Sequence, residues 1–560
     1  MISRTKIVCT VGPSVNSPEM IDALIKAGMN VARLNFSHGT HETHGEMIKM
    51  LKAARKKAQV PLAIMLDTKG PEMRIGKIKG EKLPLKKGDT FWFVKEQVEG
   101  DKDQITLNPS CIFGVLEKGT VVLLDDGYLL TRVVEVSEKG VKVEVDNDGV
   151  LRSGKSANIP NVEIPLPPLT EKDVEDIRFG CKHDIDIIAA SFIRSADHVV
   201  EIKKLLEEED KPEIQIIAKI ESSSGVNHFD SIVQVADGIM VARGDLGVEV
   251  PLEQVPRLQK MMIRKCYYAG KISVTATQML ESMISHPRPT RAETSDVANA
   301  IYDSTSAVML SGETAAGDFP IEATTVMKTI IDEAEKDFNY YEFLKVTSQR
   351  VFPDVPSSVA LASVRSAYSS NAKAIFAFST SGSTARLLSR FRPQMPIIAM
   401  TPRRKVYNQL ALSWGVVPIL YREASTIEEA FKQISAFALE KGYVKYGDLV
   451  IITAGSPFGK PGTTNMMIVD NIGDVLVRGS EGYGRRINGQ VAFLTAHDSR
   501  KDYEIQGKIV VINRCNEDYL PVLENVSGVI LQNNIDDIES ETYLKKAAKR
   551  IDLPIILRAE

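Results

Sequence analysis

The chain has 560 residues, of which 43% are hydrophobic and 25% are charged, and its formal net charge is −4. The length predicts several domains, and the slightly negative charge argues against nucleic acid or an anionic membrane as the main partner. The five cysteines show no Cys-x-x-Cys spacing, so we expect no disulfide or zinc framework. No signal-peptide core opens the chain and no apolar run is long enough to cross a bilayer, so we expect a cytoplasmic protein.

Short buried strands alternate with amphipathic helices in two stretches of the chain. Eight such strands are predicted, at 6–11, 29–34, 62–66, 185–190, 214–221, 238–242, 272–276 and 307–310. Eight buried strands, each followed by a helix, predict an α/β fold with a (β/α)8 TIM barrel. We assign this barrel to residues 1–70 and 168–335.

The pattern changes between these two stretches, over residues 71–167. The strands predicted there are short and separated by glycine and charged turns, with the clearest candidates at 90–94, 120–124 and 141–145. No helical period appears in this part of the chain. These features predict a small inserted β-barrel domain.

Charged residues follow two neighbouring strands of the predicted barrel. Lys219 and Glu221 alternate along a strand and therefore point to one face, while Asp245 comes directly after the next strand. Two carboxylates and a lysine can bind Mg²⁺ and a phosphoryl group, but a salt bridge at a strand end would use the same residues. Polar residues gather at the carboxyl ends of strands two to eight, which is the face where such barrels carry out chemistry.

A second α/β block follows the barrel, and we assign residues 336–477 to it. Its strand at 374–378 leads into a hydroxyl-rich loop at a helix start, formed by Ser379, Thr380, Ser381, Gly382, Ser383 and Thr384. Such a loop can bind an anion, although an ordinary capped helix explains the same residues. Because a second loop rich in Gly and Pro lies at 455–465, we expect a phosphorylated effector. A linker at 480–484 then leads to a last small unit at 485–560.

Several long motifs resemble those of the pyruvate kinase family. They occur in order over about the first 475 residues, and their length makes chance agreement negligible. They read NVARLNFSHG at 30–39, LDTKGPE at 66–72, AKIE at 218–221, VARGDLG at 241–247, ATQMLESM at 276–283, PTRAE at 289–293 and MLSGET at 309–314. The resemblance implies a catalytic barrel, an inserted lid domain and a C-terminal α/β effector domain.

This resemblance also implies a reaction, the final step of glycolysis. The phosphoryl group of phosphoenolpyruvate would pass to ADP, giving pyruvate and ATP. Mg²⁺ or Mn²⁺ would be held by Glu221 and Asp245, while Lys219 would neutralise charge on the phosphoryl group in flight. The catalytic residues would be Lys219, Thr277 and Arg33. Thr277 would take part in protonation of the enolate through a water chain, because its own hydroxyl is a poor acid.

The remaining site residues follow from the same resemblance. Substrate contacts are implied for Arg33, Lys219, Arg243, Gly244, Asp245 and Thr277. Nucleotide contacts are implied for Asn35, His38 and Arg74. A K⁺ cage is implied for Asn35, Ser37, Asp67 and Thr68, and Glu72 adds negative charge close to it. His38, His41 and His44 lack the ligand frame of a metal site, so we do not predict one there. The family also implies a homotetramer.

The last unit resembles the phosphohistidine domain of phosphoenolpyruvate-utilising enzymes at residues 484–491. The segment that should carry the histidine, at 536–542, contains none, so we expect a structural or regulatory domain.

Two alternatives to an active allosteric pyruvate kinase are open. A catalytically inactive sensor is disfavoured because Lys219, Glu221, Asp245 and Thr277 are all present. A barrel lyase or aldolase is disfavoured by the inserted domain and Arg74. Fructose 1,6-bisphosphate, ribose 5-phosphate and AMP are all compatible effectors.

Overall fold

The computed structural model describes residues 3–160, 162–350, 352–421, 424, 426–456, 462–473, 479–494 and 505–559. They fall into two compact units, Met1–Asp470 and Asn471–Glu560, and each unit is described by itself. Every helix among the described residues is too short or too polar to span a lipid bilayer.

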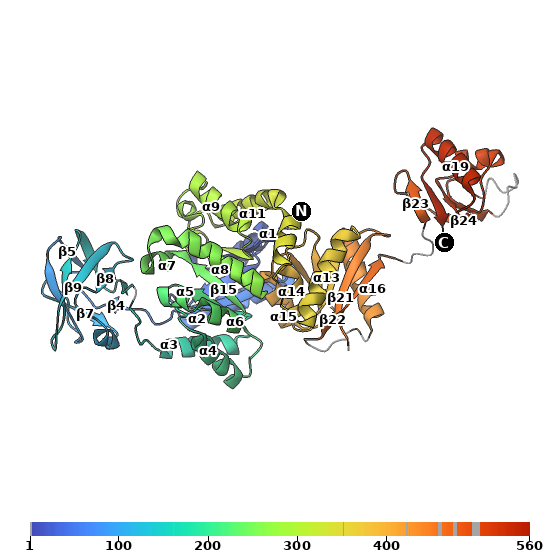
Figure 1. Ribbon diagram of the computed structural model, residues 1–560. Coiled ribbons are helices and arrows are strands. Elements are labelled where there is room, and N and C mark those ends of the chain that lie inside the picture. Colours follow the sequence, from blue (N-terminus) through green and yellow to red (C-terminus); the bar gives the residue numbers. More distant parts are fainter. Residues whose placement is uncertain are drawn as a thin grey trace. The chain divides into compact units, whose positions relative to one another are not determined.

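Eight parallel strands of the first unit close into a barrel in the order β1-β17-β16-β15-β14-β13-β3-β2, so the predicted TIM barrel is confirmed (Figure 1). Nearly all of their residues are buried, because helices cover the outside and side chains fill the inside. The strands are β1 Lys6–Thr10, β2 Val31–Asn35, β3 Ala63–Asp67, β13 Ile187–Ala190, β14 Gln215–Ile220, β15 Gly238–Ala242, β16 Ile272–Ala276 and β17 Ala307–Leu310.

Helices follow the barrel strands. Their starts are set locally: the Ser17 side chain accepts from the Met20 N–H at the first helix, and Thr170 and Thr290 form capping boxes at two others. The helices are α1 Pro18–Ala27, α2 His41–Ala58, α3 Glu171–Lys182, α4 Ala196–Glu208, α5 Ser223–Asn227, α6 Phe229–Val235, α7 Arg243–Glu249, α8 Val255–Ala269, α9 Arg291–Tyr302, α10 Gly312–Ala315 and α11 Pro320–Asp337.

The inserted domain is a nearly closed, mostly antiparallel barrel, as predicted. A seven-stranded sheet runs in the order β12-β8-β9-β10-β6-β7-β4, and β11 pairs with β5. One short 3₁₀ helix, Ser110–Gly114, was not anticipated. The strands are β4 Arg74–Ile75, β5 Lys82–Leu85, β6 Thr90–Val94, β7 Gln104–Asn108, β8 Val121–Leu124, β9 Leu129–Ser137, β10 Gly140–Val145, β11 Gly149–Arg152 and β12 Ala157–Asn158.

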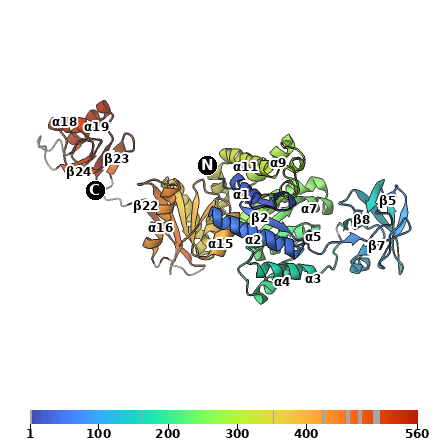
Figure 2. The same ribbon diagram turned by 180° about the vertical axis from the view of Figure 1, so that it is seen from behind.

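The α/β block that follows the barrel has a five-stranded sheet in the order β20-β19-β18-β21-β22. It packs on the barrel through α15, which lies beside the end of α2 (Figure 2): Tyr407 Oη donates to Gln59 O, and Gln409 Nε2 donates to Asp186 O. Its elements are α12 Tyr340–Thr347, α13 Val355–Ser369, β18 Ala374–Phe378, α14 Ser383–Ser389, β19 Ile397–Thr401, α15 Arg404–Gln409, β20 Val416–Leu420, α16 Ile427–Glu440, β21 Leu449–Gly455 and β22 Thr464–Asn471.

The second unit has its own sheet, in the order β23-β27-β26-β25-β24, and its own buried core. The predicted linker at 480–484 is wrong in part, because Gly479–Tyr483 forms β23 and pairs antiparallel with β27. Most of the histidine-free segment at 536–542 lies within α19, which begins at Ile538. The elements are β23 Gly479–Tyr483, β24 Val491–Leu494, β25 Ile509–Ile512, α18 Leu520–Asn525, β26 Gly528–Leu531, α19 Ile538–Ile551 and β27 Ile555–Ala559.

Candidate active site

A buried lysine lies among polar side chains at the carboxyl ends of the barrel strands. Lys219 Nζ donates to Asp67 Oδ1 at 3.0 Å and to Ser191 Oγ at 2.7 Å, and it lies 3.0 Å from Glu221 Oε1. These three acceptors match the three N–H groups of an ammonium. Burial disfavours the charged form, but the carboxylates of Asp67 and Glu221 outweigh burial and raise the pKa of Lys219. The lysine therefore keeps its charge and a fixed orientation.

Two carboxylates lie together beside this lysine. Glu221 follows β14, and Asp245 lies in the first turn of α7, directly after the paired strand β15. Glu221 Oε2 accepts from the Phe192 N–H at 2.6 Å, and the negative charges of Asp245 and Asp67 also act on Glu221. Burial raises the pKa of Glu221 to about 7, with Lys219 opposing the shift, and burial also raises the pKa of Asp245.

This carboxylate pair suits a divalent cation. Two buried acids that ionise reluctantly side by side gain stability from a positive charge between them. Among the described residues, no group of three or more His, Cys, Asp and Glu side chains is placed to hold a metal. A site with two carboxylates is typical of Mg²⁺ that completes its coordination with water and substrate phosphate oxygens.

A cavity of about 440 Å³ brings together most of the residues predicted for the barrel site, although Arg243, Gly244 and Thr277 do not line it. Asp67 and Thr68 of the predicted K⁺ cage are buried, with exposed fractions of 0% and 2%, and both bind Ser191. The residues that line the cavity are Arg33, Asn35, Ser37, His38, Lys69, Glu72, Arg74, Ser191, Phe192, Lys219, Glu221 and Asp245.

Arg33 and Arg74 are both held by carboxylates at this cavity. Arg33 Nε donates to Asp67 and its Nη1 donates to Thr10 Oγ1 at 2.8 Å, so part of the guanidinium is already committed. Arg74 Nε donates to Glu72 Oε2 at 2.7 Å, and Arg74 Nη1 donates to the carbonyl of Gly154. A bidentate grip on phosphate by Arg33 would therefore use the nitrogens that do not bind Asp67.

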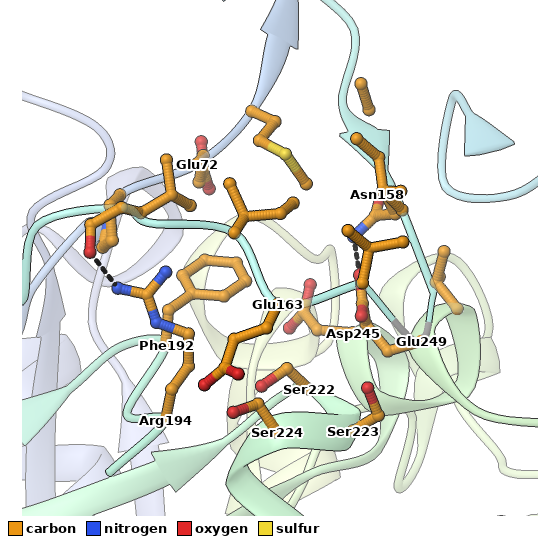
Figure 3. Close-up of a pocket in the computed structure, with 18 of the residues that line it drawn as sticks. Glu72, Asn158, Glu163, Phe192, Arg194, Ser222, Ser223, Ser224, Asp245 and Glu249 are labelled. Carbon is orange, nitrogen blue, oxygen red and sulfur yellow. Dashed lines mark hydrogen bonds between the residues drawn. The ribbon is translucent and has the colours of Figure 1, made fainter. Parts of the chain in front are cut away.

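A second cavity, of about 560 Å³, shares Glu72, Arg74, Phe192 and Asp245 with the first. Figure 3 shows its acidic side chains, its three consecutive serines and a link from the inserted domain to the barrel: Asn158 Nδ2 donates to Glu249 Oε1 at 2.9 Å. These residues were not predicted from the sequence, although the serines follow Glu221 directly. The newly found lining residues include Asn158, Glu163, Arg194, Ser222, Ser223, Ser224 and Glu249.

Thr277 and Arg243 belong to a hydrogen-bond network between neighbouring loops. Thr277, in the left-handed conformation with φ of 66°, donates to Ala276 O at 2.6 Å, and its Oγ1 accepts from the Gly244 N–H at 2.8 Å. The Arg243 guanidinium donates to Thr277 O and Asp296 Oδ1, each at 2.7 Å. The side chain of Arg243 is thus engaged by Thr277 and Asp296, and its contact with substrate stays a prediction.

The histidines after β2 have structural partners. His41 Nε2 lies 2.6 Å from Asp176 Oδ1, and the His44 ring stacks on Phe36 at 4.0 Å between centroids. His44 Nε2 is hydrogen-bonded to the carbonyl of His38 at 2.8 Å. These contacts fix the segment that carries Ser37 and His38 at the cavity.

The hydroxyl-rich loop of the C-terminal α/β domain leads into α14. Ser381 Oγ donates to Ser383 Oγ at 3.0 Å, and the buried Thr384 Oγ1 is hydrogen-bonded to Thr464 Oγ1 at 2.7 Å. Gly382, at φ of 79°, adopts the left-handed conformation that favours glycine. Part of the second predicted loop, at 457–461, lies outside the described residues.

Comparisons with known proteins point to one family. The family model for the pyruvate kinase barrel domain matches residues 2–324, and that for the pyruvate kinase alpha/beta domain matches residues 357–469. The pyruvate kinase of Chlamydia muridarum is 46% identical over 482 residues, 85% of this chain and 99% of the relative. That of Staphylococcus epidermidis is 44% identical over 536 residues, 95% of this chain and 91% of the relative. A crystal structure of a pyruvate kinase from Cryptosporidium parvum superposes with a TM-score of 0.81 at 39% identity, covering 84% of this chain and 96% of that chain.

Proposed function

Because the chain belongs to the pyruvate kinase family, we propose that Lys219, Glu221 and Asp245 form the centre of its active site. The chain has pyruvate kinase activity. Its substrates are then phosphoenolpyruvate and ADP, and its products are pyruvate and ATP. The observation that carries the assignment is the buried, fully hydrogen-bonded ammonium of Lys219 beside two reluctantly ionised carboxylates at a cavity.

The family uses divalent and monovalent cations. In this chain, Glu221 and Asp245 would hold Mg²⁺ or Mn²⁺. When bound, the divalent ion supplies positive charge for the phosphoryl oxygens and the enolate. Binding of the divalent ion would displace the proton for which the two buried carboxylates otherwise compete. Metal binding and deprotonation of Glu221 and Asp245 are therefore coupled.

The side chains of the cavity position the phosphoryl group and stabilise its charge. Phosphoryl transfer asks for little covalent chemistry from a protein, so placement and electrostatics dominate. Lys219 presents a charge held by three partners, and Arg33 adds a second cation to the phosphate side. The main chain at the start of α7, around Gly244 and Asp245, faces the substrate carboxylate.

Protonation of the enolate completes the reaction. Thr277 is held by Ala276, Gly244 and Arg243 at the loop after β16. Because a threonine hydroxyl is a poor acid, Thr277 orders a water chain that delivers the proton. Arg243 acts through Thr277 as a positioning residue.

A K⁺ ion would be held by Asn35, Ser37, Asp67 and Thr68. Amide, hydroxyl and carboxylate oxygens from β2, β3 and the residues after them supply a donor set suited to a weakly hydrated cation. Glu72 lines the same cavity as Asn35 and Ser37 and adds negative charge there.

The nucleotide lies beside Asn35, His38 and Arg74 in this proposal, which places ADP at the cavity that these residues line. A phosphorylated effector binds the loop Ser379, Thr380, Ser381, Gly382, Ser383 and Thr384, where N–H groups and hydroxyls meet at a helix start. We further propose a cytoplasmic homotetramer, as the family resemblance implies.

The experiment replaces each proposed metal ligand with its isosteric amide. Glu221→Gln and Asp245→Asn should each lower kcat by at least about a hundredfold at low millimolar Mg²⁺, because a ligand of the charge-stabilising ion is lost. Glu249→Gln, which alters a carboxylate of the second cavity instead, is the matched control and should keep most of its turnover. Near-normal kcat in either ligand variant would refute the assignment.

A further inference from the structure

Three arginines of the C-terminal α/β domain meet at the base of the barrel. Arg386 lies on α14, and Arg390 and Arg392 come just after the end of this helix. They line a cavity of about 10 Å³ together with Lys271 and Ser413. Arg390 and Arg392 each expose only 2% of their surface. The cavity lies where the amino ends of β16 and β17 meet this domain.

Protein acceptors satisfy only part of this cluster. Arg392 Nη1 donates to Ser389 O at 2.8 Å, Arg392 Nη2 donates to Ser304 O at 3.0 Å, and Arg390 Nη2 donates to Arg350 O at 2.7 Å. Four buried polar atoms of the lining residues have no hydrogen-bond partner within the described part of the chain: Arg386 Nη1, Arg390 Nε, Arg392 Nε and Ser413 Oγ. Buried donors in proteins are rarely left unpaired.

The charge of the cluster is not balanced at short range either. Within the described ranges, no Asp or Glu oxygen lies within 4.0 Å of these three guanidinium groups. Asp237 acts on Arg386, and Asp354 acts on Arg390, only from farther away. Lys271 adds a fourth cation, and its Nζ donates to Ala236 O at 2.6 Å. Burying several like charges without a counter-ion is costly.

We propose that this cavity binds one chloride ion. A volume near 10 Å³ leaves room for one water molecule or one monatomic ion, which excludes phosphate and organic anions. A water molecule could accept two hydrogen bonds but would leave the charge unbalanced. Chloride accepts hydrogen bonds from several donors at once and brings the missing negative charge. The site would join Arg390 and Arg392 of one domain to Lys271 of the other, so chloride would stabilise the junction between barrel and C-terminal α/β domain.

Thermal unfolding of the full chain in KCl and in potassium gluconate at equal concentration tests this site. The wild type should unfold at a higher, saturably chloride-dependent Tm. Ser413→Ala removes one unpaired donor and should raise the apparent Kd for chloride by about tenfold, the usual effect of losing a hydrogen bond to a charged group. Ser435→Ala is the matched control, because Ser435 Oγ is also buried and unpaired in this domain but does not line the cavity.

Crystals of the wild type soaked in bromide give an independent readout. An anomalous peak in contact with Arg390, Arg392 and Ser413 would support the site. Three results would each overturn the chloride site: equal Tm values in the two salts, an equal chloride response of Ser413→Ala and Ser435→Ala, or a cavity without a bromide peak. A cavity without a bromide peak would assign the density there to water.

Discussion

Removing the charge of Lys219 separates its proposed catalytic role from metal binding. Lys219→Met keeps the length of the side chain but deletes the ammonium that contacts Asp67, Ser191 and Glu221. A fixed cation at a phosphoryl group in flight contributes about 10³ to 10⁵ in rate, or roughly 4 to 7 kcal/mol. We therefore expect kcat to fall by at least about a thousandfold.

The same substitution should leave the divalent metal bound. Glu221 loses a positive neighbour 3.0 Å away, so its attraction for a second cation rises, and Mn²⁺ affinity should be unchanged or higher. Arg33 still pairs with Asp67, which keeps that carboxylate neutralised. Lys69→Met, which removes another lysine of the same cavity, is the control and should cost far less activity.

Two assays distinguish the steps. ADP-dependent pyruvate formation reports phosphoryl transfer, and exchange of the pyruvate methyl hydrogens with deuterated water reports enolisation, which needs the metal and the proton relay but no phosphoryl transfer. Lys219→Met should lose the first activity far more than the second. A variant that keeps kcat within tenfold of the wild type, or that loses both activities and metal binding together, would refute the reasoning.

Three further predictions follow from individual contacts. Wild-type turnover should fall when K⁺ is replaced by a tetraalkylammonium ion at fixed ionic strength, and Glu72→Lys should relieve that dependence; equal rates of the wild type in both salts would contradict it. Ser381→Ala should raise the activation constant for the effector and leave the rate at saturating effector unchanged. Thr384→Ala should do the same and should also lower Tm, because Thr384 Oγ1 is hydrogen-bonded to Thr464. Unchanged activation constants in both variants would place the effector elsewhere. Burial lowers the pKa of Lys6 to about 8 from 10.5, so below pH 8 folding buries its charge, and the wild type gains stability as the pH rises above 8. Lys6→Met should therefore be more stable at pH 7 by up to about 3 kcal/mol and should lose that advantage toward pH 10, as measured by urea unfolding; a pH-independent difference would contradict it.

The sequence predicted the barrel well because its strands are buried on both faces and read as continuous apolar runs. Lys219 and Glu221 could be placed on one face from the strand period alone, and the pairing of β14 with β15 brings Asp245 to them. The edge strand β23 was mistaken for a linker because Gly479–Tyr483 is rich in small polar residues. Its pairing with β27, far along the chain, overrides that local signal.

Other parts of the site depend on contacts that no local pattern records. Ser191 directly follows the strand predicted at 185–190 and was not among the predicted site residues, yet its hydroxyl binds both Lys219 and Asp67. Arg243 lies in a motif of the active site, but the folded chain directs its guanidinium to Thr277 and Asp296. The buried arginine cluster joins segments more than a hundred residues apart, so only the packed domains reveal it.

Anomalous diffraction from crystals grown with Mn²⁺ and phosphoenolpyruvate tests the central assignment most directly. The account predicts one strong peak at the carboxyl ends of β14 and β15, coordinated directly by Glu221 and Asp245 at about 2.1 Å, with the remaining ligands from substrate and water. A Mn²⁺ peak elsewhere in the cavity, with neither Glu221 nor Asp245 among its ligands, would contradict it.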